Sequence, residues 1–448
     1  MNHRLSTFSA LVLLGLGAAQ GSAGAAAGLS PARGFVPREV IVKFEADAGA
    51  RTVKLPAGVG VRRAAAVLDR SPAVAYAAPN YVASASAPTP FLTATGLPND
   101  PGPIEGPPGP PGGWVSLQGN FLPWSGATGQ LPTSPGGIDA LGAWRNLRAA
   151  GRPGGRGAVV AVLDTGVAYR SLGKRVRRSP DFGRGQFVPG HDFVSGDRLP
   201  LDHNGHGTHV AGTIAESTDN GVGLVGLAHG ARLMPVRVLD KHGSGEAAEI
   251  ARGIRFAVNH GADVINMSFN FGCGKRVPSI NEELRRAYRA GVVAVASIGN
   301  LGAETCVSPP ATGPRVIGVG GTTEGGCLGS YSLTGRDIDL VAPGGGVATV
   351  GCPSVAARPI YQVTLRGGDT RRFGEPGSYV GTSMAAAHVS GLAALVLASR
   401  LLGPERTPAA LVDRGTRRRR NTARDLGLPS TRQGAGLIDA GRATAPLP

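Results

Sequence analysis

Short apolar runs and longer amphipathic stretches alternate along the chain between residues 138 and 443. The apolar runs are rich in Val, Ile and Ala, as strands buried on both faces are. They cover residues 159–163, 233–239, 263–267, 292–297, 316–319 and 338–341. Helical patterns cover residues 247–258, 279–290 and 384–399. This alternation predicts one α/β domain over residues 138–443, with a mainly parallel sheet covered by helices on both faces. A short tail, residues 444–448, follows it.

The first 27 residues have the pattern of a secretory signal. His3 and Arg4 give a basic start, residues 8–19 are apolar, and alanines follow at a cleavable site. The apolar stretch is too short for a permanent anchor, and no later run reaches the length of a membrane span. We therefore expect a secreted, extracellular protein with no membrane anchor after signal cleavage.

Two further segments precede the α/β domain. Residues 28–82 contain strand patterns at 38–44 and 74–82 and a short helical stretch at 64–68, which predict a small α+β unit. Residues 83–137 are dominated by Pro, Gly, Ser and Ala, which favours a flexible linker or extended loop. Trp114 and Trp124 are expected to anchor the end of this segment to the domain surface.

Three motifs carry the candidate chemistry. Asp164 ends an apolar strand pattern, at the sheet edge where α/β proteins bind ligands. His206 lies between glycines ahead of a helix of small residues and titrates near neutral pH. Ser383 follows Gly-Thr at the start of a helix, where free N–H groups favour developing negative charge. A serine needs such a base to act as a nucleophile, and a carboxylate can orient the base.

The motifs, in the order Asp, His, Ser, resemble those of subtilisin-like serine proteases of the secreted bacterial type (subtilases, peptidase family S8). The resemblance implies a doubly wound sheet and the roles of orienting group, general base and nucleophile for Asp164, His206 and Ser383. It assigns Asn300, after the strand pattern at 292–297, to the oxyanion hole. It also implies that residues 28–82 are a propeptide that inhibits the enzyme and assists its folding.

The resemblance further suggests where a substrate lies. Gly243, Ser244, Gly245 and Ser268 match the segments beside which the family binds a peptide as an added strand. Three departures border the pocket that the resemblance implies. Ile298 stands where a small residue is usual, Leu301 stands where an acid is common, and Phe-Asn-Phe-Gly from Phe269 replaces the usual Leu-Gly-Gly. Apolar walls without an acid predict a preference for medium-sized apolar residues before the scissile bond, over Lys or Arg.

Four cysteines, an even number, fall in the α/β domain, and none forms a C-x-x-C pair. Disulfides in an oxidising compartment are therefore favoured over a zinc site. Three pairings are possible, and the preferred one joins Cys273 to Cys306 and Cys327 to Cys352, since each closes a local loop.

Composition adds little to this interpretation. The net charge is +16, with its densest cluster at residues 417–420, but no aromatic interleaving or nucleic-acid module accompanies it, so we expect no specific nucleic-acid partner. Subtilases often carry structural calcium. The spacing of Asp192, Asp197 and Asp202 matches no calcium loop, so these acids are interpreted as solvated surface groups and no cofactor is expected for catalysis.

The sequence thus predicts a monomeric, secreted serine endopeptidase that hydrolyses polypeptides through an acyl-enzyme and is made as a self-processed zymogen. The alternative is a catalytically silent, extracellular subtilase-like binding or scaffold protein. An esterase with the same triad is disfavoured, because no Gly-x-Ser-x-Gly elbow surrounds Ser383.

Overall fold

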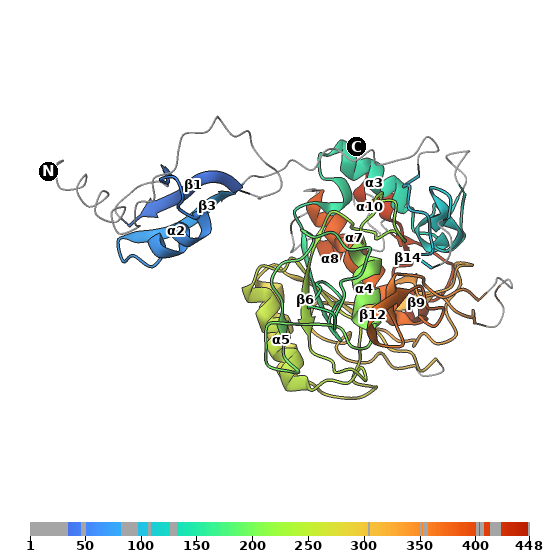
Figure 1. The fold of residues 1–448 in the computed structure, drawn as a ribbon. Helices are drawn as coiled ribbons and strands as arrows, with labels where there is room; N and C mark the ends of the chain where they lie inside the picture. Colours follow the sequence, from blue (N-terminus) through green and yellow to red (C-terminus); the bar gives the residue numbers. More distant parts are fainter. Residues whose placement is uncertain are drawn as a thin grey trace. The chain divides into compact units, whose positions relative to one another are not determined.

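The structure is a computed structural model, and it divides into two compact units, Met1–Thr89 and Pro90–Pro448 (Figure 1). The residues that it describes are 35–45, 51–81, 97–105, 109–125, 132–302, 305–349, 352, 357–399, 403, 407–412 and 423–446. The predicted signal, residues 1–27, lies outside them. Within these ranges, no helix has the length and apolar character needed to cross a membrane.

In its described residues, 35–45 and 51–81, the first unit consists of a three-stranded antiparallel sheet and one helix. Its elements are β1 (Phe35–Phe44), β2 (Arg51–Lys54), α2 (Val61–Leu68) and β3 (Val74–Tyr81). The strand order is β2-β1-β3. Val40 and Val42 of β1 pack with Val61 and Ala64 of α2 in a separate small core. The two predicted strands and the helix are confirmed, and β2 is a strand that the sequence pattern did not predict.

The second unit is built on a large sheet. In the described part of this unit, nine strands form it in the order β13-β14-β10-β9-β8-β7-β4-β6-β5. All neighbours pair in parallel except β13 and β14. These strands are β4 (Val159–Asp164), β5 (His191–Asp192), β6 (Arg232–Arg237), β7 (Val264–Met267), β8 (Val293–Ser297), β9 (Val316–Thr322), β10 (Leu340–Pro343), β13 (Ala423–Arg424) and β14 (Leu437–Ile438).

Helices cover both faces of this sheet, as the predicted α/β class requires. Helices α4 (His206–Ala215) and α7 (Thr382–Ala398) pack together on one face, and α5 (Ala247–Asn259) and α6 (Pro278–Arg289) pack together on the other (Figure 1). Strands β4, β8 and β9 are therefore buried along their whole length. The remaining elements are η2 (Gly113–Ser116), η3 (Gly119–Phe121), α3 (Ala140–Ala149), η4 (Pro153–Gly155), β11 (Thr364–Arg366), β12 (Asp369–Gly374), α8 (Thr407–Val412), α9 (Ser430–Gln433) and α10 (Ala440–Thr444).

The end of the Pro/Gly-rich segment packs into the domain, and Trp114 lies in the core instead of at the expected place on the domain surface. Trp114 and Phe121 are fully buried, and both rings pack against Trp144 of α3. The Trp114 indole N–H donates to the carbonyl oxygen of Pro98 at 3.2 Å. Two large aromatic side chains remove enough apolar surface from water to fix this segment despite its composition. The folded domain thus extends upstream of residue 138.

Replacing Trp114 by Ala is expected to destabilise the second unit by about 3–5 kcal/mol, because it removes a fully buried aromatic side chain and leaves a cavity. Thermal unfolding followed by far-ultraviolet circular dichroism, which does not rely on tryptophan fluorescence, measures this change. The matched control is Val347→Ala, whose side chain is 61% exposed and whose loss should change stability by less than about 0.5 kcal/mol. Equal melting temperatures for the two variants would contradict a core role for Trp114.

Candidate active site

The site lies where parallel strands of the sheet end. Asp164 is the last residue of β4, Ser268 follows β7, and Asn300 lies three residues beyond β8. Because β4, β7 and β8 are neighbours and run in the same direction, their carboxyl ends meet at one edge. Helices α4 and α7 bring His206 and Ser383 to this edge with their first residues.

His206 and Asp164 are directly bonded. His206 Nδ1 lies 2.7 Å from Asp164 Oδ1, which also accepts a hydrogen bond from the Thr165 N–H at 2.8 Å. Asp164 is fully buried, whereas the His206 side chain is 24% exposed. The carboxylate accepts from Nδ1–H, so Nε2 of the neutral ring carries the lone pair. His206 is thus oriented to take a proton at Nε2.

The pKa of His206 lies above its ordinary value of 6.5. Burial by itself lowers this pKa, but the negative charge of Asp164 and its hydrogen bond favour the imidazolium more strongly, and Asp202 adds to the effect. The same carboxylate that fixes the tautomer therefore stabilises the cation that forms when His206 takes a proton.

The loop before His206 is fixed by Asp202. Its Oδ1 accepts from the N–H groups of Asn204 and Gly205, both at 2.9 Å, and from the Thr165 hydroxyl at 3.0 Å. Its Oδ2 accepts from the Thr208 N–H at 3.0 Å and the Thr208 hydroxyl at 2.6 Å. Asp202 is buried, so its interpretation as a solvated surface acid is wrong. It links the Asp164 strand to the start of α4.

Asp192 is also buried, and it forms a 2.8 Å ion pair with Arg237. Of the three acids interpreted as solvated, Asp197 alone is exposed. Within the described ranges, no group of three or more His, Cys, Asp or Glu side chains is arranged to hold a metal ion.

Ser383 is the second residue of α7. Its hydroxyl donates to the carbonyl oxygen of Ser268 at 3.1 Å, and the Ser268 hydroxyl donates to the carbonyl oxygen of Ser383 at 2.8 Å. The N–H groups in the first turn of a helix have no partner within the helix, so the Ser383 N–H is available to a ligand. The structure therefore places Ser383 against Ser268, with its hydroxyl turned toward that carbonyl and not toward His206.

Asn300 is exposed and contacts the start of α7. Its Oδ1 accepts from the Thr382 N–H at 2.9 Å and from the Thr382 hydroxyl at 2.8 Å. Only the amide oxygen can accept these two bonds, so Nδ2 is the free donor. The Asn300 Nδ2 and the Ser383 N–H are consequently two donors at the start of one helix, as an oxyanion hole requires.

Replacing Asn300 by Leu is expected to lower kcat by about 10²–10³, with little change in KM, because the lost donor acts on the transition state. Steady-state kinetics on a short peptide measures the effect. The matched control is Asn259→Leu, which removes an exposed amide at the end of α5, away from the site, and should leave kcat and KM unchanged. A loss confined to KM would rule out an oxyanion role for Asn300.

The residues predicted to contact substrate have different environments. Gly243, Ser244 and Gly245 are exposed in the loop after β6, where Ser244 N–H donates to Asp240 at 3.0 Å. Their contact with a peptide strand stays a prediction. Ile298 is fully buried, and a Cβ on Gly318 or Gly320 would lie 3.5 or 3.4 Å from its side chain. Its side chain packs in the core, and its contribution to a substrate pocket stays a prediction.

Two further histidines are packing residues. His209 Nε2–H donates to the carbonyl oxygen of Ile360 at 2.9 Å, and the ring stacks on Tyr379 with centroids 4.1 Å apart. His388 Nε2 lies 2.8 Å from Asn120 Nδ2. Burial lowers the pKa of His209 to about 3 and that of His388 to about 4. Both rings are therefore neutral at physiological pH and pack inside the domain.

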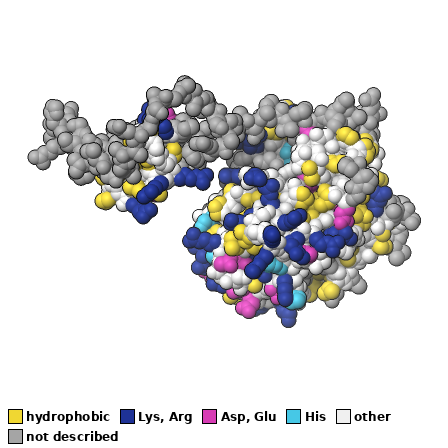
Figure 2. Space-filling view, viewed as in Figure 1, with side chains coloured by type: hydrophobic (Ala, Val, Ile, Leu, Met, Phe, Trp, Pro, Cys, Tyr) yellow, Lys and Arg dark blue, Asp and Glu magenta, His cyan; other side chains and the backbone are white. Residues whose placement is uncertain are grey.

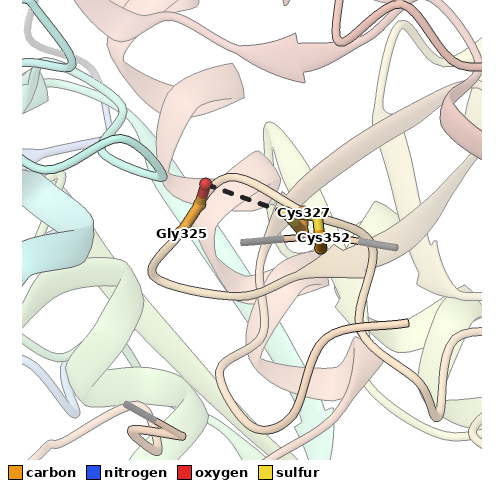
Figure 3. The surroundings of a disulfide bond; sticks show 3 residues. All are labelled: Gly325, Cys327 and Cys352. Atoms are coloured by element: carbon orange, nitrogen blue, oxygen red, sulfur yellow. Dashed lines mark hydrogen bonds between the residues drawn. A yellow bond between two sulfur atoms is a disulfide. The ribbon is translucent and has the colours of Figure 1, made fainter. Parts of the chain in front are cut away.

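One of the two predicted disulfides is present. Cys327 and Cys352 are joined, and the Cys327 sulfur lies near the carbonyl oxygen of Gly325 (Figure 3). Cys273 and Cys306 are thiols, and the Cys273 thiol donates to the carbonyl oxygen of Cys306 at 2.8 Å. The predicted bond between them is therefore wrong for this structure, because Cys273 Sγ points at backbone oxygen instead of at the second sulfur.

Sequence reasoning missed three residues that shape the site. Thr382 orients the Asn300 amide, and Asp202 holds the loop before His206. The ring of Tyr379 lies beside His206, with the two ring centroids 6.4 Å apart. Asp202 carries a local signal, since the carboxylate of an Asp in a turn such as Asp-His-Asn-Gly commonly accepts from the backbone N–H two residues on. Thr382 and Tyr379 carry no comparable signal.

Known proteins resemble this chain in sequence. Residues 155–436 match the model of the subtilase family, peptidase family S8. A thermophilic serine proteinase of Bacillus sp. (strain AK1) is 38% identical over 244 residues, which are 54% of this chain and 53% of that protein. A thermostable alkaline protease of Halalkalibacterium halodurans is 37% identical over 290 residues, 65% of this chain and 68% of that protein. Subtilisin Savinase of Lederbergia lenta is 35% identical, over 65% of this chain and 91% of that protein.

Solved structures of proteases also resemble this chain. A protease from Pseudoalteromonas arctica aligns with a TM-score of 0.59 and 28% identity, over 78% of this chain and 98% of that chain. A cold adapted subtilisin-like serine proteinase aligns with a TM-score of 0.50 and 30% identity, over 64% of this chain and 89% of that chain. The chain belongs to the subtilase family, and its second unit has the fold of a subtilisin-like serine endopeptidase. The chain matches about half of the length of the thermophilic serine proteinase of Bacillus sp. (strain AK1).

Proposed function

We propose that the protein is a secreted serine endopeptidase that cleaves polypeptides through an acyl-enzyme on Ser383. The observation that carries this proposal is the 2.7 Å bond between buried Asp164 and His206, at the same sheet edge as Ser383 and Asn300. A silent scaffold would have no reason to keep a carboxylate, a base and two unpaired donors together. The names of the relatives, all proteases, add support.

In the proposed reaction, the Ser383 hydroxyl turns from Ser268 to His206. Oγ attacks the carbonyl carbon of the substrate, and its proton passes to Nε2 of His206. The carbonyl oxygen becomes an oxyanion that accepts hydrogen bonds from the Ser383 N–H and the Asn300 amide. His206 then gives the proton to the leaving amine, the C–N bond breaks, and the acyl group stays on Oγ. Water then attacks the acyl carbon while His206 takes its proton. The ester bond to Oγ breaks, the acid leaves, and His206 returns the proton to Ser383 Oγ.

Residues 28–82 are proposed as a propeptide that is removed by the enzyme itself. The first unit supports this, because its strands and helix enclose their own core and are linked to the second unit through a Pro- and Ala-containing segment. Self-processing is expected between residues 82 and 96, a segment outside the described residues. The released unit would act as an inhibitor in trans, and the mature enzyme would be monomeric.

The test is secretion of the parent chain beside Ser383→Ala, followed by intact mass, peptide turnover and labelling with a serine-directed phosphonate. The proposal requires that the parent alone loses the segment before about residue 96, cleaves peptide and gains the label on Ser383. If both chains are processed alike and neither turns over peptide or takes the label, the protein is the silent scaffold.

Cleavage after medium-sized apolar residues remains our prediction for specificity, now based on Phe269 and Phe271, which are partly buried beside the core. A peptide pair that differs only in Leu or Arg before the scissile bond is expected to show kcat/KM higher for Leu by about tenfold or more, as an apolar pocket discriminates by about 1–3 kcal/mol. Faster cleavage after Arg would exclude an apolar pocket.

A further inference from the structure

A cluster of exposed cations lies beside the catalytic histidine loop. Lys174, Arg177, Arg371 and Arg372, the basic rim, line a surface hollow of about 560 Å³ together with Gly173 and Asp369. All four cations are exposed. Lys and Arg side chains are spread over the visible face of the molecule (Figure 2), but here they surround one concavity.

The hairpin of β11 and β12 joins this rim to the active site. The Thr364 hydroxyl at its base donates to the carbonyl oxygen of Gly205, the residue before His206. At its turn, a Cβ on Gly368 would lie 3.0 Å from the carbonyl oxygen of His203. The hairpin therefore lies along the loop that carries the catalytic base.

The loop with Lys174 is fixed to the far strand of the same hairpin. The Arg177 N–H donates to the carbonyl oxygen of Thr370 at 2.9 Å, and the Thr370 hydroxyl donates to the carbonyl oxygen of Arg175 at 2.8 Å. Two backbone segments thus hold the four cations in a defined arrangement next to each other.

The rim has unbalanced charge. Asp369 is the carboxylate among the lining residues, and it bonds to the Arg371 guanidinium at 3.3 and 3.4 Å. Four cations and one carboxylate leave a net charge of +3 on the lining. Exposed like charges gathered in a hollow repel each other and raise the local concentration of anionic groups.

We infer that the basic rim binds acidic side chains of a polypeptide substrate on the C-terminal side of the scissile bond. The inference rests on the proposed function. His206 gives its proton to the leaving amine, so the C-terminal part of the substrate starts beside His206. Three residues of strand separate Gly368 from Arg371, about 10 Å, which an extended peptide covers in about three residues. An acid at the second to fourth residue after the cleaved bond would therefore reach the rim.

The test compares peptides with a common apolar residue before the scissile bond and Glu, Gln or Lys at the second to fourth positions after it. For the parent enzyme, kcat/KM is expected to be about fivefold higher for Glu than for Gln at low ionic strength, a size typical of a few exposed ion pairs. Raising the salt to about 0.5 M should remove most of this preference, because the screening length then falls to a few ångströms.

The variant Lys174→Gln/Arg177→Gln/Arg372→Gln should lose the preference for Glu and keep its rate on the Gln peptide. The matched control, Arg145→Gln/Arg285→Gln/Arg289→Gln, removes the same charge from exposed positions of α3 and α6 and should keep the preference.

The inference is overturned if the parent cleaves Glu and Gln peptides equally, if the control loses the preference too, or if acids matter only before the scissile bond. Binding of a heparin oligosaccharide or anionic vesicles by the rim, with no Glu preference in cleavage, also overturns it. An enzyme that cleaves none of the peptides refutes the proposed function itself.

Discussion

The Ser383→Ala variant is expected to lose about 10⁶ in kcat, the full contribution of a triad that acts as one unit. Without Oγ no acyl-enzyme forms, and what activity remains comes from the oxyanion donors and from substrate binding. The residual rate is measured by incubating a fluorogenic peptide with micromolar enzyme for several hours, which makes a loss of this size detectable.

Folding should be unaffected by this change, because Ala is a strong helix former and Ser383 is the second residue of α7. Equal melting temperatures for the parent and the variant check this point. Ser378→Ala, an exposed serine in the same segment, should retain parental kinetics. Activity of Ser383→Ala within tenfold of the parent would remove Ser383 as the nucleophile.

Asp164→Asn is expected to lower kcat by about 10⁴, because an amide at this position can favour the wrong His206 tautomer and cannot stabilise the imidazolium. Asp164 is fully buried, so no solvent carboxylate replaces it. The control is Asp197→Asn, an exposed acid whose loss should leave kcat unchanged.

The same variant should change the pH profile. The active base is neutral His206, so kcat/KM of the parent rises with pH as the proton leaves, with a midpoint above 6.5 because Asp164 raises the pKa. Without the carboxylate the pKa of His206 falls, and the residual activity of Asp164→Asn should reach its plateau at lower pH. An unchanged midpoint would mean that Asp164 does not act on the titrating group.

The positions of the three proposed triad residues could be predicted from the sequence, because each lies at the end of a strongly patterned element. Asp164 closes a run of fully buried residues, and Ser383 opens a helix of small apolar ones. Local pattern fixes the position of such residues along the chain, and the parallel sheet brings their ends together. Asn300 follows the same logic, since it lies three residues beyond the end of a buried strand.

What the sequence could not predict depends on contacts between distant residues. Ile298 continues the ladder of β8, and the alternation of side chains there turns it into the core. The burial of Asp192 depends on Arg237, 45 residues away. The sequence suggested Trp114 as an anchor at the domain surface, but its full burial depends on packing against Trp144 of α3, which no local pattern reveals.

The hydrogen bond between Asn120 and His388 bears on how far the N-terminus of this protein can be truncated. Asn120 lies upstream of residue 138, where the predicted domain begins. His388 lies in the second turn of α7, the helix that carries Ser383. A recombinant chain begun at residue 138, where the motif pattern starts, would lack both this support and the Trp114 anchor. A catalytic domain made without its leader should therefore begin no later than Leu97, and refolding yield would decide between nearby start points.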